Sequence, residues 1–205
     1  MRKISTKLYQ YAELSDRAKE KARQWWLDCR DSSDFDFVLD DFADVAALLG
    51  ISLGSYKVRT VGGKEYDKPA LYWSLAYCQD DGAGFEGSYS YKADAPEAIR
   101  EHAPKDERLH RIADRLHALQ AQHGNTLEAR ITTGRSVYVS VELTSPDDGD
   151  HSTDAEKELR AHMRDLGDWL YEQLRAGDEY QCSEDQIAEA MESNGYEFTE
   201  DGAWY

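Results

Sequence analysis

Three carboxylates surround a glycine-containing turn in the middle of the chain. Asp80 and Asp81 precede the turn at residues 82–84, and Glu86 follows it. Carboxylate oxygens bind hard cations and exchange protons with substrates, so the cluster is a candidate site for a metal-dependent hydrolase. However, the spacing lacks the ligand alternation of a calcium loop, and Asp-Gly is an ordinary hairpin turn. Cys78 has no histidine near it in the sequence, which favours a buried structural thiol.

The histidines do not complete a metal site or a catalytic group by their spacing. His110 and His117 lie on one predicted helix about 10 Å apart along its axis, too far to share an ion without other ligands. The other four, His102, His123, His151 and His162, form no HExxH-like pattern either. A phosphate-binding loop, a dinucleotide fingerprint and a nucleophile elbow are also missing from the sequence. We therefore expect a protein that is not an enzyme, with no cofactor and no bound metal.

Acidic residues are concentrated in the last third of the chain. The net charge is −17, and residues 142–205 contain 19 acids and 4 bases. A helix predicted from about residue 153 to 175 carries five of these acids within about 80° of its circumference. They are Asp154, Glu158, Asp165, Asp168 and Glu172, and the preceding loop adds Asp147, Asp148 and Asp150.

This acidic stripe is either a solvated helix face or a docking face for a protein with a basic surface, since opposite charge steers association. We predict that these acids bind a partner, with Asp80, Asp81 and Glu86 as a second contact. The same negative field disfavours direct binding of DNA or RNA.

The pattern of apolar residues predicts an α+β fold with an antiparallel sheet of about five or six strands and helices on one face. Alternation from Leu71 to Tyr91 indicates a central hairpin that buries Trp73 and Phe85, and Trp25 or Trp26 should pack a helix against it. The loop at residues 145–150 predicts a boundary. Residues 1–144 would form the core domain, and residues 145–205 an acidic helical extension with a terminal hairpin, packed on the core.

Several features that the sequence lacks indicate the cellular compartment of the protein. The chain has no apolar run of transmembrane length, and its start has no apolar centre of a signal peptide. The three cysteines, Cys29, Cys78 and Cys182, are scattered and odd in number, which argues against a disulfide framework or a structural zinc. We expect a cytoplasmic protein without membrane contact, and we leave the oligomeric state open.

Four segments carry a resemblance to a known group of proteins. YAELSDRAKEKARQWW, QDDGAGFEGSYSYK, HAPKDERLHRIADRLHALQAQH and SNGYEFTEDG together resemble the phage and prophage family called "antitoxin of toxin–antitoxin stability system". The resemblance runs from about Tyr11 to Gly202. It implies a small cytoplasmic phage protein with a protein partner, and it transfers no catalytic residue. The acidic composition is also similar, in class only, to anti-CRISPR proteins that mimic nucleic acid.

These observations favour a non-catalytic phage- or prophage-encoded inhibitor. It would bind a host defence protein and occupy the surface on which that protein binds nucleic acid. Two alternatives remain open: an antitoxin that neutralises a cognate toxin by direct binding, and the metal-dependent hydrolase that would use Asp80, Asp81 and Glu86.

Overall fold

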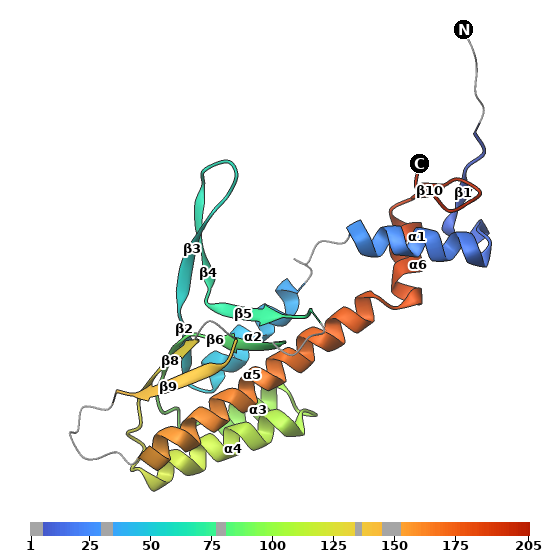
Figure 1. Ribbon diagram of the computed structural model, residues 1–205. Helices are drawn as coiled ribbons and strands as arrows, with labels where there is room; N and C mark the ends of the chain where they lie inside the picture. Colours follow the sequence, from blue (N-terminus) through green and yellow to red (C-terminus); the bar gives the residue numbers. More distant parts are fainter. Residues whose placement is uncertain (1–5, 30–34, 77–80, 134–136, 145–152) are drawn as a thin grey trace. The chain divides into compact units, whose positions relative to one another are not determined.

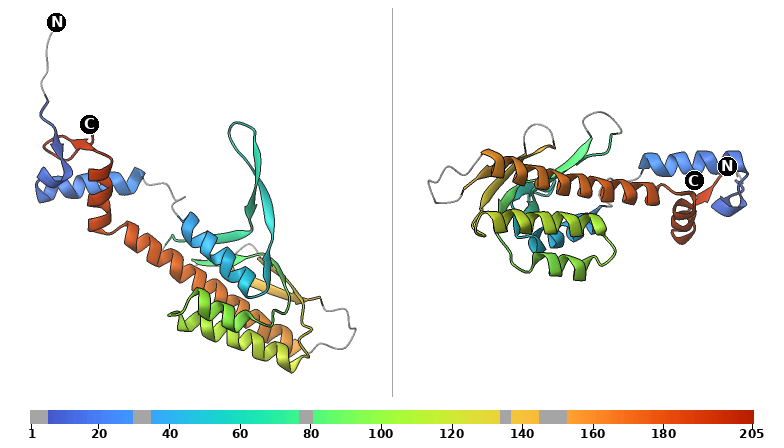
Figure 2. Two further views of the ribbon diagram at one scale, coloured as in Figure 1. Left: turned by 180° about the vertical axis from the view of Figure 1, so that it is seen from behind. Right: turned by 90° about the horizontal axis from the view of Figure 1, so that it is seen from below.

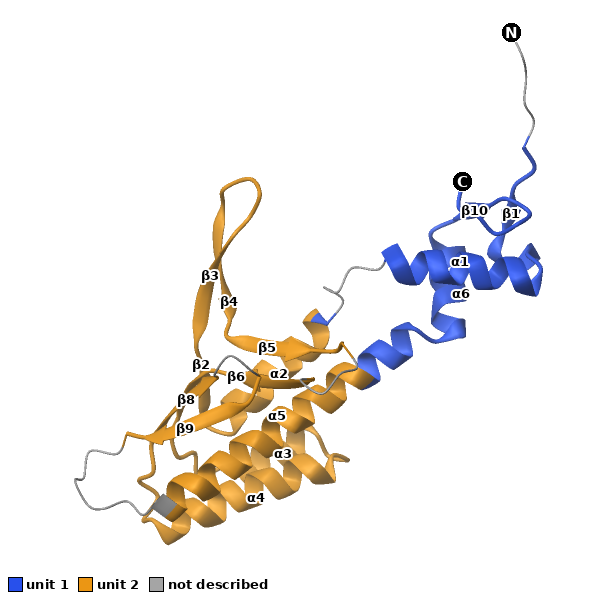
Figure 3. Cartoon of the chain, viewed as in Figure 1, with its two compact units in different colours: residues 1–35, 176–205 blue, residues 36–175 orange. Residues whose placement is uncertain are grey.

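A computed structural model describes residues 6–29, 35–76, 81–133, 137–144 and 153–205 (Figure 1). It has a mixed α+β fold with antiparallel strand pairing, which confirms the predicted fold class. The chain forms two compact units, one of residues 1–35 with 176–205 and one of residues 36–175 (Figure 3). This division does not follow the boundary expected near residue 145, because the long helix that begins at Thr153 belongs to the larger unit up to residue 175.

The larger unit is built on a four-stranded antiparallel sheet. Its strands are ordered β2 (Ile51–Leu53), β7 (Gly87–Tyr89), β8 (Ala129–Thr133) and β9 (Val139–Leu143). Ile131 and Val141 are buried, whereas their neighbours Arg130 and Glu142 are exposed. The alternation shows that one face of the sheet is covered and the other is open to solvent.

Gly54, Ala70 and Glu86 form a ring of three backbone hydrogen bonds, and the strands that run through these residues change their pairing partners there. Gly54 N donates to Glu86 O (2.8 Å), Glu86 N to Ala70 O (2.9 Å) and Ala70 N to Gly54 O (2.8 Å). Beyond this ring, β3 (Ser55–Arg59) pairs with β4 (Glu65–Pro69), and β5 (Leu71–Ser74) pairs with β6 (Gly82–Phe85). The predicted central hairpin therefore exists as β5 and β6 but ends at Glu86. In place of one sheet of five or six strands, the described residues form a four-stranded sheet and two-stranded pairs.

Four helices of the larger unit lie on the covered side of its sheet: α2 (Asp36–Leu48), α3 (Ala95–His102), α4 (Glu107–Gln122) and most of α5 (Thr153–Gln181) (Figures 1 and 2). Phe42 of α2 contacts Phe85 at 5.3 Å and Trp169 of α5 at 6.4 Å between ring centroids. Phe85 is fully buried, as predicted, whereas Trp73 is only half-buried. The apolar residues that recur at helical spacing along α5 are also buried: Ala155, Leu159, Met163, Leu166, Leu170 and Leu174.

Two glycines of the larger unit permit close backbone approach. A Cβ at Gly84 of β6 would lie 2.1 Å from Val137 O, and one at Gly167 of α5 would lie 2.7 Å from Ala83 O. Neither Gly82 nor Gly84 has positive φ. The turn predicted at residues 82–84 is therefore wrong: both glycines lie in strand β6, which packs against its neighbours with almost no space for a side chain.

The smaller unit joins the two ends of the chain. It contains β1 (Tyr9–Gln10), η1 (Tyr11–Glu13), α1 (Asp16–Cys29), the end of α5, α6 (Glu184–Ser193) and β10 (Glu197–Phe198), and β1 pairs with β10. Trp25 packs edge-on against Phe198 (5.9 Å) and stacks on Trp204 (5.0 Å). Trp25 and Trp26 both pack on the core of the smaller unit, so the prediction that one of them packs a helix against the central hairpin is wrong. Phe42 of α2 makes that contact, through Phe85.

Candidate functional site

Two carboxylates of the acidic stripe on α5 form ion pairs with arginines of the same unit. Arg115 of α4 pairs with Asp165 at 3.2 Å, and Arg108 of α4 pairs with Glu172. Arg108 also donates to the backbone oxygen of Asp165 (3.3 Å). The arginines on one flank of α4 thus face the carboxylates of α5. Asp165 and Glu172 therefore help to hold two helices together, and their predicted contact with a partner stays a prediction.

The N-terminal half of the stripe faces solvent. The side chains of Asp154 and Glu158 are 87% and 51% exposed, and Asp154 has Lys157 at 3.3 Å while Glu158 has His162 at 3.8 Å. Both side chains are therefore accessible on the helix surface, and their docking role stays a prediction. The loop acids Asp147, Asp148 and Asp150 lie outside the described residues.

Asp168 is a carboxylate of the α5 stripe that, among the described residues, is neither paired like Asp165 nor fully solvated. The residue is exposed, yet partial burial of its carboxyl raises its pKa, Arg108 opposes that rise, and Asp165 and Glu172 add to it. Burial and the neighbouring carboxylates both disfavour the charged form of Asp168, so this side chain favours a proton or a cation beside it.

A second acidic stripe on α2 was not among the predicted contacts. Asp36, Asp40 and Asp44 are spaced by four residues and are all exposed, so they share one helix face. None of the three forms an ion pair with another residue in the described part of the chain, whereas Asp41 on the next face pairs with His102 at 2.9 Å. The four-residue spacing is visible in the sequence and could have revealed this stripe.

The carboxylates proposed for hydrolase chemistry have structural partners. Asp81 accepts hydrogen bonds from Ser74 Oγ and Ala76 N, both at 3.0 Å, and so closes the end of the β5–β6 hairpin. Glu86 accepts from Thr133 N (3.0 Å) and Thr133 Oγ1 (2.7 Å), which ties β6 to the end of β8.

Asp80 and Cys78 lie outside the described residues. Over the described parts of the chain, no group of three or more potential ligands is placed to hold a metal ion.

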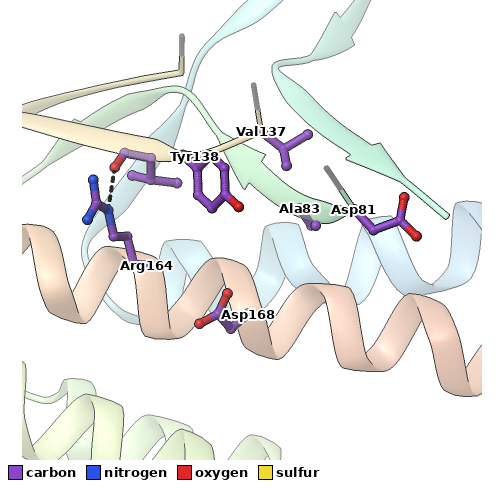
Figure 4. A pocket seen from close by; sticks show the side chains of 8 residues that line it. Asp81, Ala83, Val137, Tyr138, Arg164 and Asp168 are labelled. Carbon is purple, nitrogen blue, oxygen red and sulfur yellow. Dashed lines mark hydrogen bonds between the residues drawn. The ribbon is translucent and has the colours of Figure 1, made fainter. Parts of the chain in front are cut away.

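A cavity of about 160 Å³ lies between β6, β9 and α5 (Figure 4). Asp81, Tyr138, Arg164 and Asp168 contribute its polar lining, and Arg164 Nε donates to Val139 O at 3.1 Å. Pockets for small molecules usually exceed about 300 Å³. The cavity brings Asp81 and Asp168 to one place, which the sequence did not suggest, but its size suits water or a small ion rather than a substrate.

One family matches the chain. It is described as a domain of unknown function (DUF8835), and its match covers residues 35–184. The chain belongs to this family. The DUF8835 match contains the whole larger unit and the α5 stripe, so the features described above are features of that domain. Comparisons with curated proteins and with solved structures found no match. None of the helices in the described residues combines the length and apolar character needed to cross a membrane.

Proposed function

We propose that this chain is a non-catalytic, cytoplasmic inhibitor of phage or prophage origin that binds a host defence protein on its nucleic-acid-binding surface. The observation that supports it is the exposure of regularly spaced carboxylates on rigid helices of an acidic domain. A nucleic-acid-binding protein offers the complementary surface, because its affinity for nucleic acid rests on lysines and arginines that neutralise phosphates.

The rigid presentation of these carboxylates supports a docking role. Helix α5 has 29 residues, and its core side is fixed by buried side chains, so Asp154 and Glu158 are held at a constant spacing. On α2, Asp36, Asp40 and Asp44 repeat every turn, about 6 Å apart along the axis. Like charges at this spacing cost a helix a few tenths of a kcal/mol each. Their presence without interspersed bases favours a role in binding over a role in helix stability.

The proposal divides the α5 stripe by function. Asp154, Glu158 and Asp168 would face the partner, and Asp36, Asp40 and Asp44 would extend the contact on α2. Asp165 and Glu172 would support the helix from the side of α4. An antitoxin would make the same kind of contact, but with a toxin in place of a defence protein. The identity of the partner therefore distinguishes the antitoxin alternative from the inhibitor proposal.

The test compares two charge-reversed proteins with the natural chain. The first carries Asp154→Lys and Glu158→Lys, and the second carries Asp36→Lys, Asp40→Lys and Asp44→Lys. Host proteins retained by the natural chain are identified, purified and assayed for nucleic-acid binding in its presence. We expect the retained protein to bind nucleic acid, to lose that binding when the chain is added, and to bind at least one of the two variants about tenfold more weakly, mainly through a slower association rate.

A matched control carries Glu97→Lys and Glu101→Lys, which reverse two exposed acids on α3. This control should bind as the natural chain does. If the control and both variants bind equally well, the acidic faces are only solvated surface. If the retained protein is a toxin that does not bind nucleic acid, the antitoxin alternative replaces the proposal.

A further inference from the structure

The β3–β4 hairpin projects from the larger unit with both faces uncovered (Figures 1 and 2). We call residues 55–69 the arm. Of its strand residues, only Val58 and Lys68 are half-buried, and the rest are exposed. A two-stranded ribbon without a covering layer is only marginally stable in water. The arm is therefore a segment that gains stability when another surface covers it.

The charge of the arm is opposite to that of the chain. Residues 55–69 contain four bases and two acids, whereas the chain as a whole has a net charge of −17. The strand register separates these charges, because residues directly opposite each other in an antiparallel pair point to the same face. Lys57 lies opposite Asp67, and Arg59 lies opposite Glu65, so the charges on this face cancel.

The other face of the arm carries cations and aromatic rings without any acid. Tyr56 lies opposite Lys68, Val58 lies opposite Tyr66, and Lys64 follows on the same face at the tip. Tyr56 and Tyr66 are 38% and 46% exposed. The Tyr56 ring stacks on Tyr72 of β5 at 6.0 Å between centroids, which fixes the base of this face to the body of the unit. We call these five residues, Tyr56, Val58, Lys64, Tyr66 and Lys68, the cationic-aromatic face.

Such a face suits a partner that combines negative charge with some apolar surface. Tyrosine supplies a large contact area with little loss of conformational entropy, and it is enriched in protein interfaces. Single-stranded nucleic acid would also meet rings and lysines, but the two lysines of this face that no acid compensates are few for a run of phosphates. An acidic protein surface fits better.

The chain itself contains such a surface. Residues 176–205 contain nine acids and no base. On α6, Asp185, Glu189 and Glu192 are exposed at spacings of four and three residues and so share one face. The ten residues of α6 extend about 15 Å and the five residues of β3 about 17 Å. We propose that the cationic-aromatic face of the arm binds the acidic face of α6 in a second copy of this chain.

Sedimentation equilibrium of the full chain over a range of concentrations tests this contact. The natural chain should self-associate, and association should weaken as salt rises. Lys64→Glu with Lys68→Glu should raise the dissociation constant at least about tenfold. The matched control exchanges charge on the opposite face, Lys57→Asp with Asp67→Lys, and should associate like the natural chain.

A mixing experiment identifies the second surface. A chain with Asp185→Lys and Glu189→Lys should not self-associate, yet it should bind the chain that carries Lys64→Glu and Lys68→Glu, because the exchange restores opposite charges. Circular dichroism confirms that each variant is folded.

Three results would overturn the proposal: a natural chain that remains monomeric at all concentrations, self-association unchanged by the arm reversal, or failure of the mixed variants to associate. Binding of a labelled single-stranded oligonucleotide that is lost on the arm reversal would assign the face to nucleic acid instead.

Discussion

Reversing Asp165 and Glu172 to lysine should destabilise the larger unit, because both carboxylates pair with arginines of α4. Exposed ion pairs contribute about 0.2–1 kcal/mol each. The side chains here are between 28% and 60% exposed, which places them within that class. Reversal removes two attractions and adds two repulsions of similar size. We therefore expect the free energy of unfolding to fall by about 1–3 kcal/mol.

Urea unfolding at low salt, followed by circular dichroism, measures this loss. The second half of the experiment reverses the partners by Arg108→Glu and Arg115→Glu, alone and combined with the first two changes. The combined protein should recover part of the lost stability, and the non-additivity gives the coupling energy. Recovery should be incomplete, because Arg108 also donates to the backbone oxygen of Asp165, a bond that a glutamate carboxylate at this position could not form.

The control reverses Asp154 and Glu158, which are the same two residue types on the solvent-facing half of α5. Asp154 lies in the first turn of α5, where an acid is favoured by the helix dipole, so its reversal should cost about 0.3–1 kcal/mol. Reversal of Glu158 should change the free energy of unfolding by less than about 0.5 kcal/mol. If both double reversals have the same stability, and no coupling to Arg108 and Arg115 is measured, the pairs are not formed in solution. The division of the stripe into a structural half and a docking half would then fail.

Three further measurements test the fold. Phe85→Ala should lower the free energy of unfolding by about 3–5 kcal/mol, and Trp73→Ala, at a half-buried position, should cost clearly less. Gly84→Ala should be strongly destabilising because its Cβ would meet Val137 O at 2.1 Å, whereas Gly54→Ala, with its nearest atom at 3.4 Å, should be tolerated. Burial lowers the pKa of His162, so the unfolded state binds a proton that the folded state does not. Stability should fall as pH drops through about 6.5, and His162→Leu should remove that part of the fall.

The sequence predicted well those features that depend on local periodicity. The six apolar positions of α5 follow the helical repeat and are all buried, and Phe85 follows the strand repeat and is buried. The exchange of strand partners at Glu86 could not be predicted this way. The side-chain alternation continues through Glu86 without a break, although the partner of the strand changes from β5 to β2 and β8. Alternation reports which face a residue occupies and not which strand lies beside it.

Long-range pairing limited the prediction of both the units and the site. Helix α1 and helix α6 lie at opposite ends of the sequence, and their shared core of Ala18, Ala22, Ile187 and Met191 has no local signature. The loop at residues 145–150 was a reasonable boundary by composition, but a turn signal does not say with which unit the next helix packs. The arginine flank of α4 and the acidic stripe of α5 are each visible in the sequence. Only the structure shows that they face each other.

The ion pairs between α4 and α5 affect the interpretation of any binding experiment on this domain. Salt weakens the ion pairs between α4 and α5 as well as attraction to a basic partner, since both act between partly exposed charges. A loss of binding at high salt could therefore come from a loosened domain. Likewise, reversal of the whole α5 stripe would combine a folding defect with a docking defect. Variants of Asp154, Glu158 and the α2 stripe avoid this problem, because their carboxylates take no part in the pairs between α4 and α5. Binding that falls in these variants at constant unfolding free energy would assign the acidic surface to a partner.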